Sequence, residues 1–195
     1  PLAFAEHLYL MMNKPKHTIS SNKDGEHTHA SSRIPPSPNV FMIGTDTTLI
    51  DGSEHIACTL RLLDSGHGDH FYQLIARDKE NNVVNDVIYS DIFFEEAKAN
   101  MLTETNSYGL FTNSGYIGRL MILHCYIPVE NVPDSFALEL YHQTYEHYCY
   151  LQSIAVHEAY SLLPVFSPNG LYTNVYNGIG LVSGVNKWRM EFSNK

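Results

Sequence analysis

The stretch His55-Ile-Ala-Cys-Thr-Leu-Arg-Leu-Leu63 alternates apolar and polar side chains. The apolar members of the alternation are Ile56, Cys58, Leu60 and Leu62, and the polar residues on the other side include His55, Thr59 and Arg61. A period of two residues places one set on each face of an extended chain, which is typical of a β-strand with one buried side. This stretch therefore predicts a half-buried β-strand and indicates a strand-rich fold.

Further strands are expected from similar patterns along the chain. They lie at residues 70–77 and 83–89, which flank Asn81-Asn82 as a hairpin, and at residues 116–127, 135–142 and 188–192. Asn169-Gly170 and Asn177-Gly178 are dipeptides that favour tight turns. Because apolar runs flank them, these two pairs predict hairpins in the tail.

One amphipathic helix is predicted at about residues 144–162. Thr144 is a favourable N-cap, and the negative charge of Glu146 suits the first turn of a helix. An apolar stripe follows at steps of three and four residues, formed by Tyr145, Tyr148, Leu151, Ala155, Ala159 and Leu162. Tyr150 lies two steps of about 100° from Tyr148 and points away from the stripe. We therefore expect Tyr150 to be the helix residue that contacts a partner.

The fold class that these elements predict is mainly β. We expect an antiparallel β-sandwich or an open barrel, with the one helix near the C-terminus. Residues 92–99 fit either a short helix or an irregular apolar anchor.

The first part of the chain predicts a separate β-ribbon. Residues 3–12 and 26–32 form its two strands, with the turn dipeptide Asp24-Gly25 between them. Ile34-Pro35-Pro36-Ser-Pro38 follows and cannot continue a strand ladder, because proline has no backbone N–H. We therefore divide the chain into a ribbon at 1–34, a linker at 35–39 and a strand-rich domain with one helix at 40–195. A lone ribbon is marginally stable, so it either adds to another sheet or ends an upstream sandwich.

Composition argues against several classes of protein. The 195 residues carry 21 acidic and 12 basic side chains and a formal net charge of −9, which disfavours binding to nucleic acid. No run of 18 or more apolar residues occurs, so no segment is expected to cross a bilayer as a helix. The three cysteines, Cys58, Cys125 and Cys149, are widely spaced among apolar neighbours, which predicts core residues rather than a disulfide framework or a zinc site.

The 11 histidines offer two candidate pairs of metal ligands. His27 and His29 fall on the same side of a strand, and His67 and His70 lie in one loop with an acid between them. Neither spacing matches a specific metal motif, so the expectation is no metal site and no other cofactor. Glu139 and His142 have the spacing of a di-iron helix motif, but on a strand two residues three apart point to opposite faces.

Catalytic motifs are missing as well. The sequence contains no Gly-x-Ser-x-Gly element, and the adjacent acids Glu95 and Glu96 do not have the arrangement that a glycosidase needs. No Gly-x-Gly-x-x-Gly precedes a helix, so a dinucleotide site is not indicated. We therefore expect a protein that is not an enzyme and has no catalytic residues.

Several short stretches in a characteristic order carry a family resemblance. They are Ala30-Ser-Ser-Arg-Ile-Pro35, residues 60–75 around Asp64 and Phe71-Tyr72, Ser90-Asp-Ile-Phe-Phe94, residues 145–153, Leu163-Pro164, and Tyr172-Thr-Asn-Val-Tyr-Asn-Gly-Ile-Gly180. The chain resembles the outer-membrane lipoproteins of Bacteroidota that are classed as a domain of unknown function and are encoded beside TonB-dependent receptors.

This resemblance implies a location and a set of partners. It implies a lipoprotein of the outer membrane, exposed at the cell surface, whose lipid anchor and most of a first, immunoglobulin-like sandwich lie upstream of Pro1. The partners that it implies are an outer-membrane β-barrel protein and associated lipoproteins. Such a family has no established catalytic residues to transfer to this chain.

Three hypotheses about function follow. The first is a non-enzymatic accessory lipoprotein associated with an outer-membrane β-barrel complex of the TonB-dependent receptor or barrel-assembly type. The second is a surface module that binds a nutrient, peptide, glycan or metal complex, which the tyrosines and histidines suggest. The third is a hydrolase whose acid, base and nucleophile converge only in the folded chain.

Overall fold

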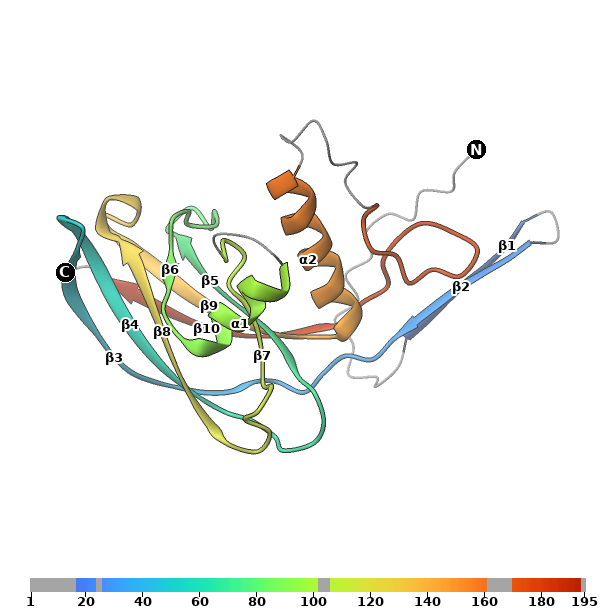
Figure 1. Ribbon diagram of the computed structural model, residues 1–195, viewed down its shortest axis with the longest axis horizontal. Helices are drawn as coiled ribbons and strands as arrows, with labels where there is room; N and C mark the ends of the chain where they lie inside the picture. Colours follow the sequence, from blue (N-terminus) through green and yellow to red (C-terminus); the bar gives the residue numbers. More distant parts are fainter. Residues whose placement is uncertain (1–16, 24–25, 102–105, 161–169, 194–195) are drawn as a thin grey trace.

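The computed structural model describes residues 17–23, 26–101, 106–160 and 170–193. Its described part is mainly β, with antiparallel sheets and one longer helix towards the C-terminus, as the sequence predicts. Two four-stranded sheets face each other, and a two-stranded ribbon extends from them (Figure 1). Neither helix in this part of the chain is long and apolar enough to cross a lipid bilayer.

The first sheet has the strand order β3-β4-β8-β6. Its strands are β3 (Asn39–Ile50), β4 (Ser53–Leu63), β8 (Leu120–Pro128) and β6 (Ile88–Tyr89). In β4 the buried apolar residues are Ile56, Cys58, Leu60 and Leu62, which are the apolar members of the alternation, and His55, which the pattern places on the polar side, is buried as well. The predicted strand is therefore confirmed, and its apolar side is the face that packs against the other sheet.

The second sheet has the strand order β10-β9-β5-β7. Its strands are β5 (Phe71–Asp78), β7 (Leu110–Thr112), β9 (Ser135–Gln143) and β10 (Val185–Ser193). Leu74, Leu138 and Leu140 point from it towards the first sheet and are fully buried. Burying a leucine side chain contributes about 2 kcal/mol, so the rows of apolar residues between the sheets dominate the stability of the fold.

Two helices and a short 3-10 turn complete the body. Helix α1 (Ile92–Met101) places Phe93 and Phe94 in the core between the sheets, which settles the question left open for residues 92–99. Helix α2 (Tyr145–Tyr160) confirms the predicted helix and covers part of the outer face of the second sheet, where Tyr148 contacts Phe71. The 3-10 turn η1 (Val129–Asn131) follows β8.

The apolar stripe of α2 is shorter than the sequence predicts. Tyr148 and Ala155 are buried, whereas Tyr145 is 56% exposed and Ala159 is also exposed. Placing Tyr145 and Ala159 in the buried stripe was therefore wrong, because these residues lie in the first and last turns of the helix, at the two ends of its contact with the sheet. Residue 162 lies outside the described residues.

The predicted hairpin of 70–77 with 83–89 forms only beside its turn, where the N–H of Val84 donates to the carbonyl of Ala76, and the rest of the predicted pairing was wrong. Val83 forms an isolated bridge with Arg77, and the chain then leaves the second sheet, so that β6 pairs with β8 of the first sheet. Asp86 has a φ of 58°, a left-handed conformation that redirects the chain between the sheets.

The strand predicted at 116–127 begins later, at Leu120. Two consecutive turns precede it, closed by hydrogen bonds from the N–H of Tyr116 to the carbonyl of Asn113 and from the N–H of Arg119 to the carbonyl of Tyr116. These turns bring Gly118 next to the end of β4, where its amide reaches the side chain of Asp64.

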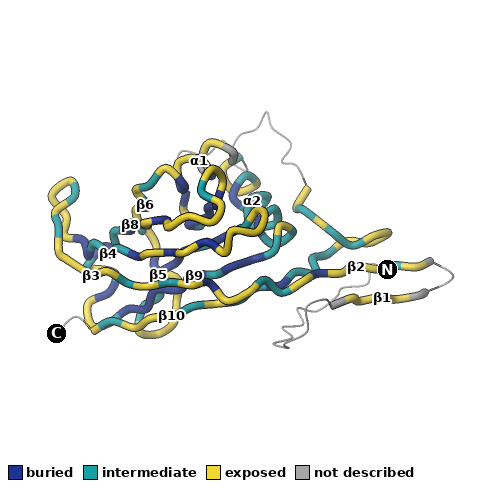
Figure 2. Tube along the Cα trace, turned by 90° about the horizontal axis from the view of Figure 1, so that it is seen from below, coloured by how far each residue is buried: buried dark blue, intermediate teal, exposed yellow. Residues whose placement is uncertain are grey.

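The ribbon pairs β1 (His17–Lys23) with β2 (Glu26–Ser32). The strand predicted at 3–12 and the turn at 24–25 lie outside the described residues. Figure 2 shows that the ribbon carries far fewer buried positions than the body. In the tail, Asn177 turns the chain at a φ of 51°, but side chains hold the two arms: Asn174 donates to the carbonyl of Val182 and accepts from its N–H. Residues 174–182 therefore form a loop rather than the hairpin predicted at Asn177-Gly178, and Asn169 of the other predicted turn lies outside the described residues.

Candidate functional site

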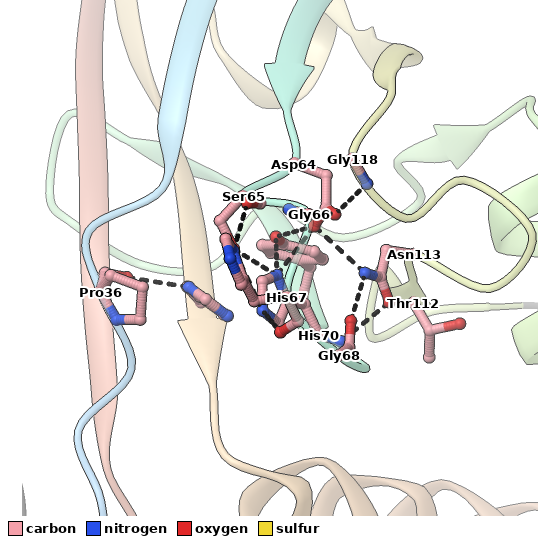
Figure 3. Close-up of polar contacts among 12 residues, drawn as sticks. Pro36, Asp64, Ser65, Gly66, His67, Gly68, His70, Thr112, Asn113 and Gly118 are labelled. Carbon is pink, nitrogen blue, oxygen red and sulfur yellow. Dashed lines mark hydrogen bonds and ion pairs between the residues drawn. The ribbon is translucent and has the colours of Figure 1, made fainter.

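A buried polar cluster lies at one end of the sandwich. Two connections supply it: the one between β4 and β5 carries Asp64 and His70, and the one between β7 and β8 carries Asn113 and Gly118. Figure 3 shows their side chains and backbone groups meeting around the carboxylate of Asp64. The cluster therefore joins loops from both sheets.

Asp64 is the centre of the cluster, and its side chain is fully buried. One carboxylate oxygen accepts hydrogen bonds from His70 Nδ1 at 2.8 Å, Asn113 Nδ2 at 3.2 Å and the Tyr72 hydroxyl at 3.3 Å. The other accepts from the backbone N–H groups of Gly118 at 2.7 Å and Gly66 at 3.1 Å. Burial alone raises the pKa of Asp64, but the hydrogen bonds outweigh it and hold that pKa below its ordinary value of 3.8.

His70 is held at both ring nitrogens. Nδ1 lies 2.8 Å from Asp64, and Nε2 lies 3.0 Å from the carbonyl oxygen of His67. Both partners offer acceptor atoms, so each nitrogen of the ring has a protein partner and the orientation of the ring is fixed.

Ser65, His70 and Asp64 have the composition of a catalytic triad but not its geometry. The Ser65 hydroxyl lies 3.3 Å from Nε2 and 3.5 Å from Nδ1, so it sits beside the ring rather than in line with one nitrogen. A general base must receive the serine proton on Nε2, and this nitrogen is directed at the carbonyl of His67. In this arrangement Nε2 is directed at the His67 carbonyl rather than at the Ser65 hydroxyl.

His142 packs against the cluster from β9. Its ring stacks on Tyr72 at a centroid distance of 4.8 Å and lies 4.8 Å from the ring of His70. Nδ1 lies 2.8 Å from the carbonyl oxygen of Pro36, which ties the segment between β2 and β3 to the second sheet. Burial, together with the positive charge of His70, lowers the pKa of His142 to about 4, so this ring is neutral at pH 7.

The pKa of His142 predicts a loss of stability in mild acid. An unfolded histidine takes up a proton near pH 6.5, whereas folded His142 does so only near pH 4. The stability that this ring contributes is therefore complete above pH 6.5 and falls by about 3 kcal/mol as the pH drops to 4. Chemical denaturation at pH 7, 5.5 and 4 measures this loss. The variant His142→Gln, which keeps a donor for the Pro36 carbonyl, should lose most of the slope in this window, and an unchanged slope would contradict the assignment.

A second buried acid lies on the outer face of the second sheet. Glu139 is fully buried in β9, and its carboxylate is bonded by Arg77 at 2.6 Å and by Lys187 and Arg189 at 2.8 Å each. The Tyr141 hydroxyl also donates to it. Burial by itself raises the pKa of Glu139, but these hydrogen bonds lower it to about 2. Glu139 and His142 point to opposite faces of β9, as the strand interpretation of this segment predicts.

The candidate metal ligands lie in two different elements. His27 and His29 are in β2 of the ribbon, where the ring of His29 lies 5.0 Å from that of Tyr176, whereas His67 and His70 are in the loop that carries Asp64. Across residues 17–23, 26–101, 106–160 and 170–193, no three or more His, Cys, Asp or Glu side chains form a group that could hold a metal ion. Both nitrogens of His70 already have protein partners.

Tyr150 is half-buried in α2, and its carbonyl accepts a hydrogen bond from the Ser153 hydroxyl. Its role in a partner contact stays a prediction.

The fold and the cluster together define a two-sheet β-sandwich whose loops are held by a buried, charged network. No family model, curated protein or solved structure matches the chain.

Proposed function

We propose that this protein is a non-enzymatic accessory subunit that binds a protein partner through the outer face of its first sheet. The partner in this proposal is an outer-membrane β-barrel complex of the TonB-dependent receptor or barrel-assembly type. The observation that supports the binding surface most directly is a set of exposed apolar side chains on adjacent strands.

These side chains form one surface, which we name the apolar face, made of Phe41, Leu63, Leu120 and Ile122. The strand register places Arg61 of β4 opposite Phe41 of β3 on one side and Ile122 of β8 on the other. The next row places Leu63 opposite Leu120. Directly opposite residues in an antiparallel sheet point to the same side, so the four apolar side chains surround Arg61 on one face.

The apolar face is open to solvent. Phe41 is 59% exposed, and Leu63, Leu120 and Ile122 are between 41% and 47% exposed. By contrast, α2 covers part of the outer face of the second sheet. Contiguous exposed apolar residues on adjacent strands favour a role in binding, and aromatic and arginine side chains are enriched in protein interfaces.

The nature of the partner rests on the resemblance described above. Lipoproteins of that kind are encoded beside TonB-dependent receptors, which supports a location at the outer-membrane surface and a β-barrel partner.

Capture from native outer membranes tests both parts of the proposal. The tagged protein, solubilised in mild detergent, should recover a β-barrel protein that mass spectrometry identifies. Replacing Ile122 with glutamate puts a charge into the apolar face and should weaken that capture by about 30-fold, which corresponds to about 2 kcal/mol.

The control carries the same substitution elsewhere. Ile179 is 71% exposed and lies in the tail, so Ile179→Glu should capture as much β-barrel as the wild type. Circular dichroism should show the same fold for both variants. Recovery without any β-barrel would overturn the proposed partner, and equal capture by Ile122→Glu would overturn the apolar face as the binding surface.

A further inference from the structure

Two of the three cysteines meet in the core of the sandwich. Cys58 of β4 lies directly opposite Cys125 of β8 in the strand register. Both are almost completely buried, at 1% and 0% exposed, and both are free thiols in this structure. The side chains of the two residues hydrogen-bond to each other. These residues are 67 positions apart in the sequence, so only the pairing of β4 with β8 brings them together.

The register satisfies the main requirement for a disulfide. Directly opposite residues in an antiparallel sheet have Cα atoms about 4.5 to 5.5 Å apart. Disulfides join cysteines whose Cα atoms are about 4.4 to 6.8 Å apart. A bond between these sulfurs therefore requires rotation of the two side chains and a small approach, but no rearrangement of the sheet.

The third cysteine is in a different place. Cys149 lies in α2, is half-buried and hydrogen-bonds with Tyr145. Because it packs near the outer face of the second sheet, it does not compete for either core thiol in the folded chain.

We propose that Cys58 and Cys125 form an intramolecular disulfide when the chain folds in the presence of a disulfide oxidant such as oxidised glutathione. The two thiols lose two protons and two electrons, one S–S bond forms between their sulfurs, and the S–S bond of the oxidant is reduced to two thiols. This inference does not rest on the proposed function, because it concerns the core of the first sheet rather than its outer face.

The burial of the pair determines when the bond forms. The hydrogen bond with Cys58 and the burial of the thiol both raise the pKa of Cys125, so little of the reactive thiolate is present once the core is closed. Oxidation is therefore expected during folding, while the thiols are still accessible. Once formed, the bond is enclosed between the sheets and protected from reductants.

The test uses the full chain with Cys149→Ser, which leaves only the two core thiols. The reduced, denatured protein is refolded with oxidised and reduced glutathione, then denatured and treated with iodoacetamide, and its intact mass is measured. We expect no alkyl group to be added, a mass about 2 Da below that of the reduced protein, and a linked peptide that contains Cys58 and Cys125. Two alkyl groups, or glutathione attached to either cysteine, would overturn the proposal.

A second measurement, on the wild type, tests the proposal if the Cys149→Ser variant folds poorly. The wild type, refolded in the same way, should contain the same linked peptide, and a linkage through Cys149 would contradict the proposal. The bond closes a loop of about 70 residues, so the oxidised wild type should melt about 10 °C higher than the same protein after reduction. Cys58→Ala should show no such difference between oxidised and reduced samples.

Discussion

Replacing Glu139 with glutamine is expected to lower the free energy of unfolding by about 3 kcal/mol. The carboxylate is fully buried and faces three cations. The side chains of these cations, Arg77, Arg189 and Lys187, are 20%, 32% and 37% exposed. Glutamine has the same shape but no charge, so it leaves these cations close together without their shared counter-ion. The expected loss is at the lower end of that for a broken buried ion pair, because water still reaches the cations.

The same substitution should change the response to acid. The pKa of Glu139 is about 2 in the folded protein and has an ordinary value of 4.5. A lowered pKa means that the stabilisation is fully present above pH 4.5 and is lost as the pH falls through about 2. Guanidinium denaturation at pH 7 and at pH 3 should therefore show a smaller difference between wild type and Glu139→Gln at the lower pH.

The exposed ion pair between Lys79 and Asp134 provides the control. Both side chains are more than half exposed, so Asp134→Asn should leave the denaturation midpoint at pH 7 unchanged within error. If Glu139→Gln changed the denaturation midpoint as little as Asp134→Asn, the prediction would be wrong. The charge of Glu139 would then not be needed to keep the three cations in place.

Much of the fold could be predicted because the strands carry local signals. In β4 and β9 the alternation of apolar residues reflects a buried inner face, and both strands appear within two residues of the predicted bounds. Residues 83–89 show the opposite case. Their apolar content resembles that of a strand, but at Asp86 the chain turns towards the other sheet. The strand propensity of the residues does not show which sheet they join.

The candidate site could be predicted only in part. The sequence predicts that His67 and His70 share one loop and are possible metal ligands, and the structure places both in the connection that follows Asp64. The convergence on Asp64 was not foreseen, since Asn113 and Gly118 come from connections about 50 residues away and reach it only through the pairing of the strands. The same holds for Cys58 and Cys125, whose spacing in the sequence gives no sign that β4 and β8 are neighbours.

Replacing Asp64 with asparagine should have the largest effect of the stability variants, a loss of about 4 kcal/mol in the free energy of unfolding. Asp64 accepts five hydrogen bonds in a position that water does not reach. The amide group of asparagine would point its own N–H donors at groups that are themselves donors, and it would lose one of the acceptor oxygens. Urea denaturation at pH 7 measures the loss, and Ser65→Ala in the exposed part of the same loop should change stability by less than about 0.5 kcal/mol.

Hydrogen exchange in Asp64→Asn shows whether Asp64 holds the two loops in place or only adds to the overall stability. The N–H groups of Gly66 and Gly118 donate to the same carboxylate oxygen of Asp64. Gly66 lies in the loop before β5, and Gly118 lies in the loop before β8. In Asp64→Asn both amides should exchange with solvent much faster than in the wild type. The amides in the middle of β4 and β9 should exchange faster only by the amount that the lower free energy of global unfolding explains. If the Gly66 and Gly118 amides kept their protection, the loops would be held by other contacts. The end of the sandwich would then not depend on the carboxylate of Asp64.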